Sequence, residues 1–153
     1  MTSKFVIRTL EPEDAPTLAM MLQSQPTTYL QYFIPFRFEE ATVQGILQQA
    51  NRDVYMGIFW QHELAGFFML RGWDAGYDVP AYGVVIAHAF RGHGLGRLSL
   101  ELSKTICRLR QVRRIMLKVH PDNLAAKYIY EMAGFMPTGV DPQNHNLIYH
   151  SDL

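Results

Sequence analysis

Cysteine is nearly absent from this sequence, because Cys107 is the only one among 153 residues. A single thiol cannot form an internal disulfide, which excludes a disulfide-stabilised secreted domain and favours a reducing compartment. The sequence also lacks an apolar run long enough to cross a membrane and an apolar N-terminal signal segment. These absences predict a cytoplasmic protein with no membrane partner.

An excess of charge of either sign is also missing, since 14 Lys and Arg residues balance 14 Asp and Glu residues. A neutral molecule has no long-range attraction to nucleic acid, so no nucleic-acid partner is predicted. The cations are nevertheless concentrated: eight of the 14 lie between Arg91 and Lys118, where Glu101 is the only acid. This cluster fits either a local anion site or a solvated helix face.

The length of 153 residues, with 48% hydrophobic and 18% charged residues, is typical of one globular domain, residues 1–153. Segments with strand and helix periodicity follow one another along the chain. Strands are predicted at 5–10, 54–60, 64–70, 81–87 and 114–120, with two more after 135, and helices at 12–22, 43–50, 94–110 and 123–133. This order predicts an α/β domain with one mixed sheet covered by helices.

Residues 91–97, Arg-Gly-His-Gly-Leu-Gly-Arg, join a predicted strand to a predicted helix. Glycines let the backbone approach a bulky anion, and the first amides of a helix present free N–H groups and the positive end of its dipole. The segment therefore suits a pyrophosphate, although glycines also form ordinary turns. A P-loop is set aside because Arg97-Leu98 follows the last glycine. A nicotinamide-binding domain is weakened by the arginine at position 97 but stays open because Asp122 follows the next strand.

A second motif, residues 123–135, reads Asn-Leu-Ala-Ala-Lys-Tyr-Ile-Tyr-Glu-Met-Ala-Gly-Phe. Ala126 and Tyr130 lie four residues apart and so share one helix face. The two motifs, in this order and with this succession of elements, resemble the GNAT superfamily of N-acetyltransferases over nearly the whole chain. The resemblance implies a mixed, mostly antiparallel sheet of six or seven strands with about four helices, and acetyl-coenzyme A as the cosubstrate.

The resemblance also implies a coenzyme site. Backbone amides of the glycine segment would hold the pyrophosphate, and Ile86 and Ala87 would pair with the pantetheine arm through their backbones. Asn123 would contact the same arm with its side chain, and Asn also favours the N-cap of a helix. The implied coenzyme-binding residues are Ile86, Ala87, Arg91, Gly92, His93, Gly94, Leu95, Gly96, Arg97, Asn123 and Tyr130.

The family's reaction is direct attack of a neutral amine on the thioester, with a base for the amine and an acid for the leaving thiolate. Tyr130 matches the acid, with a core tyrosine as the alternative. Cys107 is not expected to be a nucleophile, because it lies thirteen residues beyond Gly94 on one helix, about 20 Å along its axis. Lys118 stands where the family often has a glutamate base, so Asp78 and His88 rank first as candidate bases.

The acceptor is predicted from two aromatic segments. Residues 72–80 mix carboxylates with aromatic rings, which suits an ammonium ion or the apolar face of a sugar, and residues 29–38 border the acceptor cleft in the family. The candidate acceptor-binding residues are Tyr32, Phe33, Trp73, Asp74 and Tyr82, unless these rings pack into the core or a dimer interface.

A small primary amine, for example an amino sugar, is the predicted acceptor, and the protein is expected to be a monomer or homodimer. A peptide or protein amine, and a non-catalytic acyl-coenzyme A sensor, are the alternatives. No metal is predicted, because residues 62–66, His-Glu-Leu-Ala-Gly, lack the second histidine of a zinc-protease motif.

Overall fold

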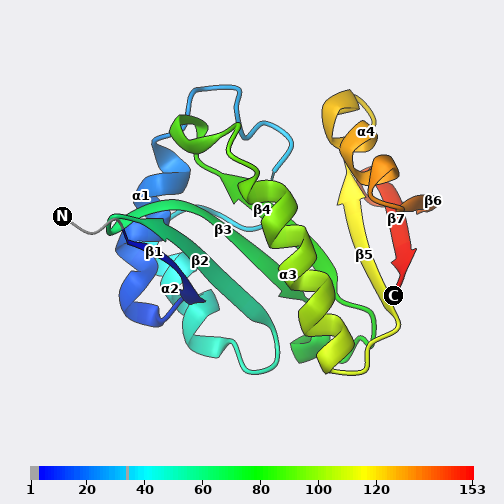
Figure 1. Cartoon of the computed structure of the whole chain (residues 1–153), viewed down its shortest axis with the longest axis horizontal. Coiled ribbons are helices and arrows are strands. Elements are labelled where there is room, and N and C mark those ends of the chain that lie inside the picture. The colour runs from blue at the N-terminus through cyan, green and yellow to red at the C-terminus, as the bar shows by residue number, and fades with distance from the viewer. Residues whose placement is uncertain (1–3, 34) are drawn as a thin grey trace.

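The computed structural model describes residues 4–33 and 35–153, so the N-terminus and one position of the aromatic segment 29–38 lie outside the described residues. Seven strands form one sheet in the order β1-β2-β3-β4-β5-β7-β6 (Figure 1). The strands are β1 (Phe5–Thr9), β2 (Val54–Trp60), β3 (Glu63–Arg71), β4 (Ala81–Ile86), β5 (Arg114–Val119), β6 (Met136–Val140) and β7 (Leu147–Asp152). The helices are α1 (Ala15–Gln23), α2 (Glu40–Gln49), α3 (Leu95–Leu109) and α4 (Leu124–Met132). The predicted mixed α/β fold is confirmed.

The first four strands form an antiparallel meander. The hairpin between β2 and β3 turns through Gln61 and His62, whose φ angles are 50° and 71°. Positive φ at both central residues gives a two-residue turn the twist that neighbouring strands require. Sequence reasoning identified this hairpin but missed three short 3-10 helices: η1 (Pro12–Asp14), η2 (Trp73–Ala75) and η3 (His88–Phe90).

Helices cover both faces of the sheet, as Figure 1 shows. Leu18 and Leu22 of α1 and Val43 of α2 pack with Phe67 of β3 on one face. Residues of α3, including Leu100 and Cys107, pack with β5 and β7 on the other face. Helix α1 buries the apolar stripe that its spacing predicts, Ala15, Leu18, Ala19 and Leu22. The stripe predicted for α3 was wrong, because this helix buries Ser99, Leu100, Ser103, Lys104 and Cys107 and leaves Leu98 and Leu109 exposed. Strand β3 lies between the two cores and has seven buried residues in succession.

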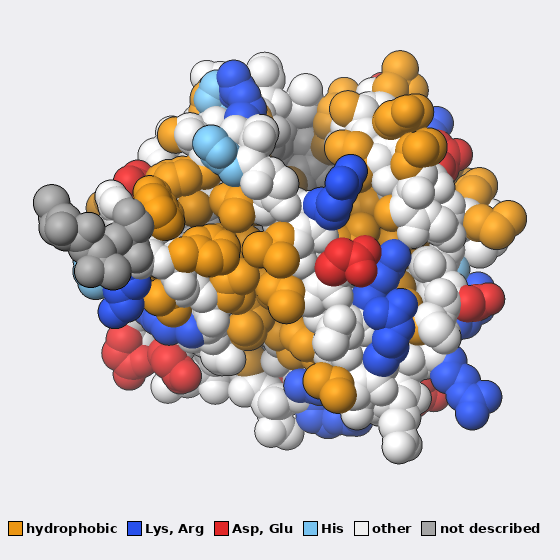
Figure 2. All heavy atoms as spheres, in the orientation of Figure 1, with side chains coloured by type: hydrophobic (Ala, Val, Ile, Leu, Met, Phe, Trp, Pro, Cys, Tyr) orange, Lys and Arg blue, Asp and Glu red, His pale blue; other side chains and the backbone are white. Residues whose placement is uncertain are grey.

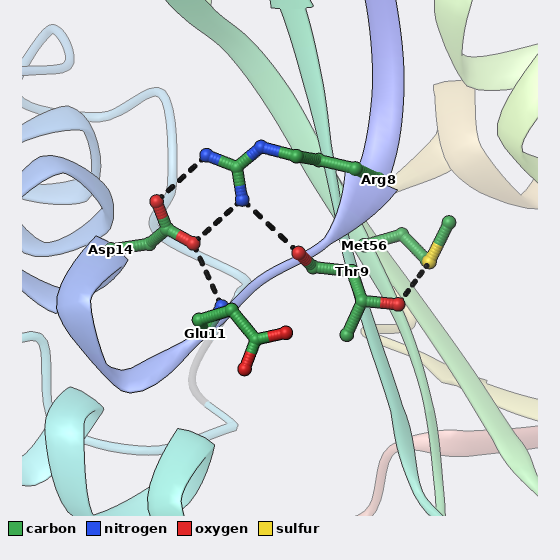
Figure 3. Close-up of polar contacts among 5 residues, drawn as sticks. All are labelled: Arg8, Thr9, Glu11, Asp14 and Met56. Carbon is green, nitrogen blue, oxygen red and sulfur yellow. Dashed lines mark hydrogen bonds and ion pairs between the residues drawn. The ribbon is translucent and has the colours of Figure 1, made fainter.

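An ion pair between Arg8 and Asp14 connects β1 to η1, just before the first helix α1 (Figure 3). The Arg8 guanidinium donates to both carboxylate oxygens of Asp14, at 2.8 and 2.9 Å. Asp14 also accepts the backbone N–H of Glu11 at 2.7 Å. The hydrogen bond from Arg8 holds the pKa of the Asp14 carboxyl below its usual value. The pair therefore sets the angle at which the chain leaves β1 and enters η1 and α1.

The only parallel neighbours in the sheet, among the described residues, are β4 and β5, and they pair at one position, Ala81 with Met116. Beyond this pair the strands diverge toward their carboxyl ends. On the amino-terminal side of this pair, the Met116 N–H of β5 donates to the carbonyl of Pro80, the residue before β4, at 3.0 Å. This hydrogen bond holds the two strands together at that end. None of the described helices is both long enough and apolar enough to span a bilayer.

Candidate active site

The diverging strands leave one row of β4 backbone groups without a strand partner. Ala87 donates its N–H to the Ala65 carbonyl of β3, at 2.8 Å. Because backbone groups alternate in direction along a strand, Val84 and Ile86 direct theirs away from β3, toward β5. We call the space between β4 and β5 beyond the Ala81–Met116 pair the gap. The space-filling view shows the surface hollowed between the α3 side and the α4 side of the molecule (Figure 2).

The backbone of Ala87 does not belong to this row. Its N–H is bonded to Ala65, and its carbonyl accepts the Phe90 N–H at 2.8 Å. The prediction that Ala87 pairs with the coenzyme was therefore wrong, because both of its polar groups are already used. Val84 takes its place beside Ile86, and period-two alternation from Ile86 was the sequence signal that could have found it.

The glycine segment between η3 and α3 has the geometry of an anion site. Gly92 and Gly94 have φ angles of 84° and 81°, which favour glycine, and Gly94 is the N-cap of α3. A side chain at Gly92, Gly94 or Gly96 would meet no atom of the described residues within 4 Å. The first amides of α3, from Leu95 to Arg97, have no intrahelical acceptor. Free N–H groups thus face open space at the positive end of a helix dipole.

Tyr82 is linked to the glycine segment through Ser99. Its hydroxyl is 2.6 Å from the Ser99 hydroxyl, which itself donates to the Gly96 carbonyl at 2.8 Å. Because the Ser99 hydrogen is used for Gly96, the Tyr82 hydroxyl is the donor to Ser99. Tyr82 is 6% exposed, and burial raises the pKa of its phenol. The predicted acceptor-binding role of Tyr82 is therefore corrected: this side chain ties β4 to the first turns of α3.

Tyr130 on α4 stands on the same side of β4. Its ring contacts Tyr82 and Phe135 edge to face, with centroids 6.3 and 5.8 Å apart. Burial raises the pKa of the Tyr130 phenol to about 12. The phenol therefore keeps its proton at neutral pH, as a proton donor must.

Asn123 begins the same helix as an N-cap. Its side-chain oxygen accepts the Ala126 N–H at 3.3 Å. This contact uses the carbonyl end of the amide and leaves its NH₂ donors for another partner. The capping role proposed from the sequence is confirmed, and the coenzyme contact remains a proposal.

Lys118, at the position where a glutamate base was expected, is already paired with an acid. The Lys118 ammonium is 2.8 Å from a carboxylate oxygen of Asp141, which precedes β7. The hydrogen bonds from Lys118 and from the Gln143 N–H hold the pKa of the Asp141 carboxyl below its usual value. The pair ties the β6–β7 hairpin to β5.

A family model described as "Acetyltransferase (GNAT) family" matches residues 18–135. The chain belongs to the GNAT acetyltransferase family. Acetyl-coenzyme A is the cosubstrate of this family. No curated protein matches the sequence of this acetyltransferase.

Solved structures share the fold at low sequence identity. PaiA N-acetyltransferase from Thermoplasma acidophilum, solved in complex with coenzyme A, is 17% identical with a TM-score of 0.78, over 98% of this chain and 99% of that one. An acetyltransferase from Thermus thermophilus is 22% identical with a TM-score of 0.77, over 98% of this chain and 97% of that one. The ribosomal-protein-S18-alanine N-acetyltransferase of Escherichia coli is 20% identical with a TM-score of 0.73, over 97% of this chain and 94% of that one.

The two candidate bases of the acetyltransferase lie at opposite ends of β4. Asp78 is exposed and precedes β4, on the closed side of the Ala81–Met116 pair. His88 follows β4 at the open end, where its backbone N–H donates to Gln25 at 2.8 Å and its ring meets Tyr29 edge to face, 5.0 Å between centroids. His88 thus lies at the open end of β4, and Asp78 lies at its closed end.

The aromatic loop 72–80 is also remote from the gap. Trp73 is 4% exposed and stacks on Arg110, which follows the C-terminal end of α3, 4.4 Å from its ring centroid. Asp74 accepts the backbone N–H groups of residues 51–53 at 3.0, 2.7 and 3.3 Å. These contacts correct the prediction that Trp73 and Asp74 bind the acceptor. Trp73 packs at the C-terminal end of the 15-residue helix α3, and Asp74 holds the loop between α2 and β2.

The segment between α1 and α2 does reach the gap. The Tyr29 hydroxyl donates to the Ile86 carbonyl at 2.6 Å. Tyr32 stacks on His120, which follows β5, with centroids 4.4 Å apart and 25° between the planes. Phe33 instead packs edge to face on Phe67 of β3, 6.0 Å between centroids, within the core. Tyr29 escaped sequence reasoning because a contact between residues 29 and 86 leaves no local pattern.

Proposed function

We propose that this chain, as a single acetyltransferase domain of residues 1–153, moves the acetyl group of acetyl-coenzyme A to the primary amine of a small molecule. The transfer is a direct attack within a ternary complex. The observation that carries this proposal is the combination of a backbone row at Val84 and Ile86 that has no strand partner with open glycine amides at the end of the same strand.

The coenzyme is held by two kinds of backbone group. Amides of residues 91–97 bind its pyrophosphate, with the guanidiniums of Arg91 and Arg97 nearby in sequence to balance the charge. The amides of the pantetheine arm pair with Val84 and Ile86 as an added strand would, and Asn123 donates its free NH₂ group to the arm. This arrangement directs the thioester along the gap toward the side where β4 and β5 meet.

The chemistry follows from the groups beside the arm. The amine nitrogen forms a bond to the thioester carbon, and the carbon–sulfur bond breaks as the tetrahedral intermediate collapses. A free N–H of the β4 row stabilises the oxyanion. Tyr130 donates its proton to the leaving thiolate, and water at the exposed gap restores that proton. His88, at the open end of the gap, takes the proton of the substrate ammonium through water molecules.

A small acceptor is favoured by the segment between α1 and α2. Tyr29 contacts the end of β4 and Tyr32 contacts the end of β5, so the segment limits the room beside both strands. The amino-sugar proposal rested on Trp73, Asp74 and Tyr82, and it is withdrawn with them. The protein is proposed to be cytoplasmic, a monomer or homodimer, without a nucleic-acid partner.

Two other functions each have one observation in their favour. A peptide or protein amine is suggested because a solved relative is a ribosomal-protein-S18-alanine N-acetyltransferase. A non-catalytic acyl-coenzyme A sensor is suggested because Lys118 occupies the position of the expected glutamate and is already paired with Asp141.

The test is the release of coenzyme A from acetyl-coenzyme A, measured with a thiol reagent, in the presence of amine panels. Turnover with small primary amines, and not with peptides of matched N-terminal residues, supports the proposal. Turnover with peptides alone identifies the protein acetyltransferase. Tight coenzyme binding by calorimetry without turnover on either panel identifies the sensor.

A further inference from the structure

The segment of residues 24–33, which we call the strap, is fixed to both sides of the gap. On one side the Tyr29 hydroxyl donates to the Ile86 carbonyl of β4 at 2.6 Å. On the other side Tyr32 stacks on His120 at the end of β5. The strap thus joins two strands that, at this end of the sheet, have no pairing with each other among the described residues.

The oxygen that receives the Tyr29 hydroxyl belongs to the backbone row that the proposed function assigns to the pantetheine arm. Ile86 directs its carbonyl toward β5, because its neighbour Ala87 bonds to β3. Hydrogen bonds to a carbonyl oxygen lie near the carbonyl plane, at about 2.9 Å for an N–H donor. A carbonyl oxygen has two lone pairs, and the hydroxyl occupies one of the two positions that an amide N–H of the arm would use.

The Tyr29 hydroxyl is a dependable donor in the free protein. Burial raises the pKa of its phenol above the usual value, so it stays protonated at neutral pH. Its ring is braced by His88, and the Gln25 side chain on the same strap receives the His88 N–H. Without coenzyme, the Ile86 carbonyl would otherwise face the gap with no protein donor, which costs more than a satisfied group.

We propose that Tyr29 is a placeholder for the pantetheine arm: its hydroxyl satisfies the Ile86 carbonyl in the free protein and is displaced when the coenzyme binds. This inference rests on the proposed coenzyme site. Displacement frees the strap at its β4 end while Tyr32 holds it at β5.

The placeholder role predicts that removal of the Tyr29 hydroxyl strengthens coenzyme A binding. Tyr29→Phe removes the competing donor and keeps the ring, so coenzyme A should bind about two- to tenfold more tightly, the equivalent of one hydrogen bond. A purely structural role would weaken binding or leave it unchanged. Adenosine diphosphate, which has the pyrophosphate but no pantetheine arm, should bind the variant and the unmodified protein equally.

The experiment is isothermal titration of both proteins with coenzyme A and with adenosine diphosphate. Tyr77→Phe is the matched control, since Tyr77 is 68% exposed on the loop before β4. Thermal melts establish that each variant is folded. Equal or weaker coenzyme A binding by Tyr29→Phe, or an equal gain for adenosine diphosphate, overturns the placeholder role. Absence of coenzyme A binding by the unmodified protein instead overturns the proposed coenzyme site.

Discussion

Two tyrosines, Tyr82 and Tyr130, meet edge to face between β4 and α4, yet the structure gives them different tasks. The Tyr82 hydroxyl is committed to Ser99, whereas the Tyr130 hydroxyl has no hydrogen-bond partner among the described residues. A phenol that is partly buried, uncommitted and protonated is suited to give its proton to a leaving thiolate. Residue type alone does not distinguish the two, because the distinction lies in which neighbour each hydroxyl meets.

At this scale we predict that Tyr130→Phe lowers kcat for acetyl transfer about 100-fold or more, the usual contribution of a general acid. The dissociation constant of acetyl-coenzyme A should stay within about twofold, because the ring and its packing remain. Steady-state kinetics and calorimetry on the same preparation measure both quantities. An unchanged kcat would remove Tyr130 from the reaction.

The raised pKa of Tyr130 adds a pH test. Because that pKa is about 12, the phenol is protonated, and hence active as an acid, at every pH well below this value. The kcat of the unmodified protein should therefore not fall between about pH 8 and pH 10. A fall in that range that Tyr130→Phe abolishes would contradict the assignment of its pKa.

At the scale of elements, helix stability and room for an anion place opposing requirements on the junction between β4 and α3. Gly96 lies in the first turn of α3 without a positive φ, so glycine is not needed there for the backbone. Glycine in a helix is less stable than alanine by about 0.5–1 kcal/mol. The helix therefore carries a residue that reduces its stability, which is consistent with a bulky anion close to its first turn.

We predict that Gly96→Ala raises the free energy of unfolding by about 0.5–1 kcal/mol. The same change should weaken acetyl-coenzyme A binding about tenfold or more, because the added methyl points toward the helix N-terminus and the pyrophosphate. Denaturant unfolding and calorimetry give the two values. Gly45→Ala in α2 is the control, since a side chain there also meets nothing within 4 Å of the described residues. It should stabilise the protein without changing coenzyme affinity.

At the scale of the whole molecule, the gap divides the sheet into a part carrying β1 to β4 and a part carrying β5 to β7. These parts are held together by one parallel pair, by α3 and by contacts such as that of the Lys104 ammonium with the Ala133 carbonyl, 3.2 Å long. A coenzyme that contacts β4, the first turn of α3 and Asn123 of α4 would bridge the two parts. Binding should therefore stabilise the molecule as a unit.

We predict that acetyl-coenzyme A at about 100 times its Kd raises stability by about 2.7 kcal/mol. For a protein of 153 residues this corresponds to a rise in Tm of about 5–10 °C. Differential scanning calorimetry measures the shift, with NADH at the same concentration as the control ligand. An equal shift with NADH would mean that the gap binds nucleotides without recognising the pantetheine arm.

The local pattern of the sequence determined the elements, the glycine segment and the N-cap at Asn123, because periodicity, glycine conformation and capping depend on neighbours within a few residues. It also carried the two motifs by which the family was identified. Tertiary structure decided which groups share a site. Trp73 and Asp74 are close in sequence to β4 but lie beyond the closed end of its pairing with β5. Ala87 is adjacent to Ile86 but directs its backbone to β3. Tyr29 is distant in sequence and yet contacts Ile86, because the path of the strap across the sheet is set by long-range packing that no local pattern records.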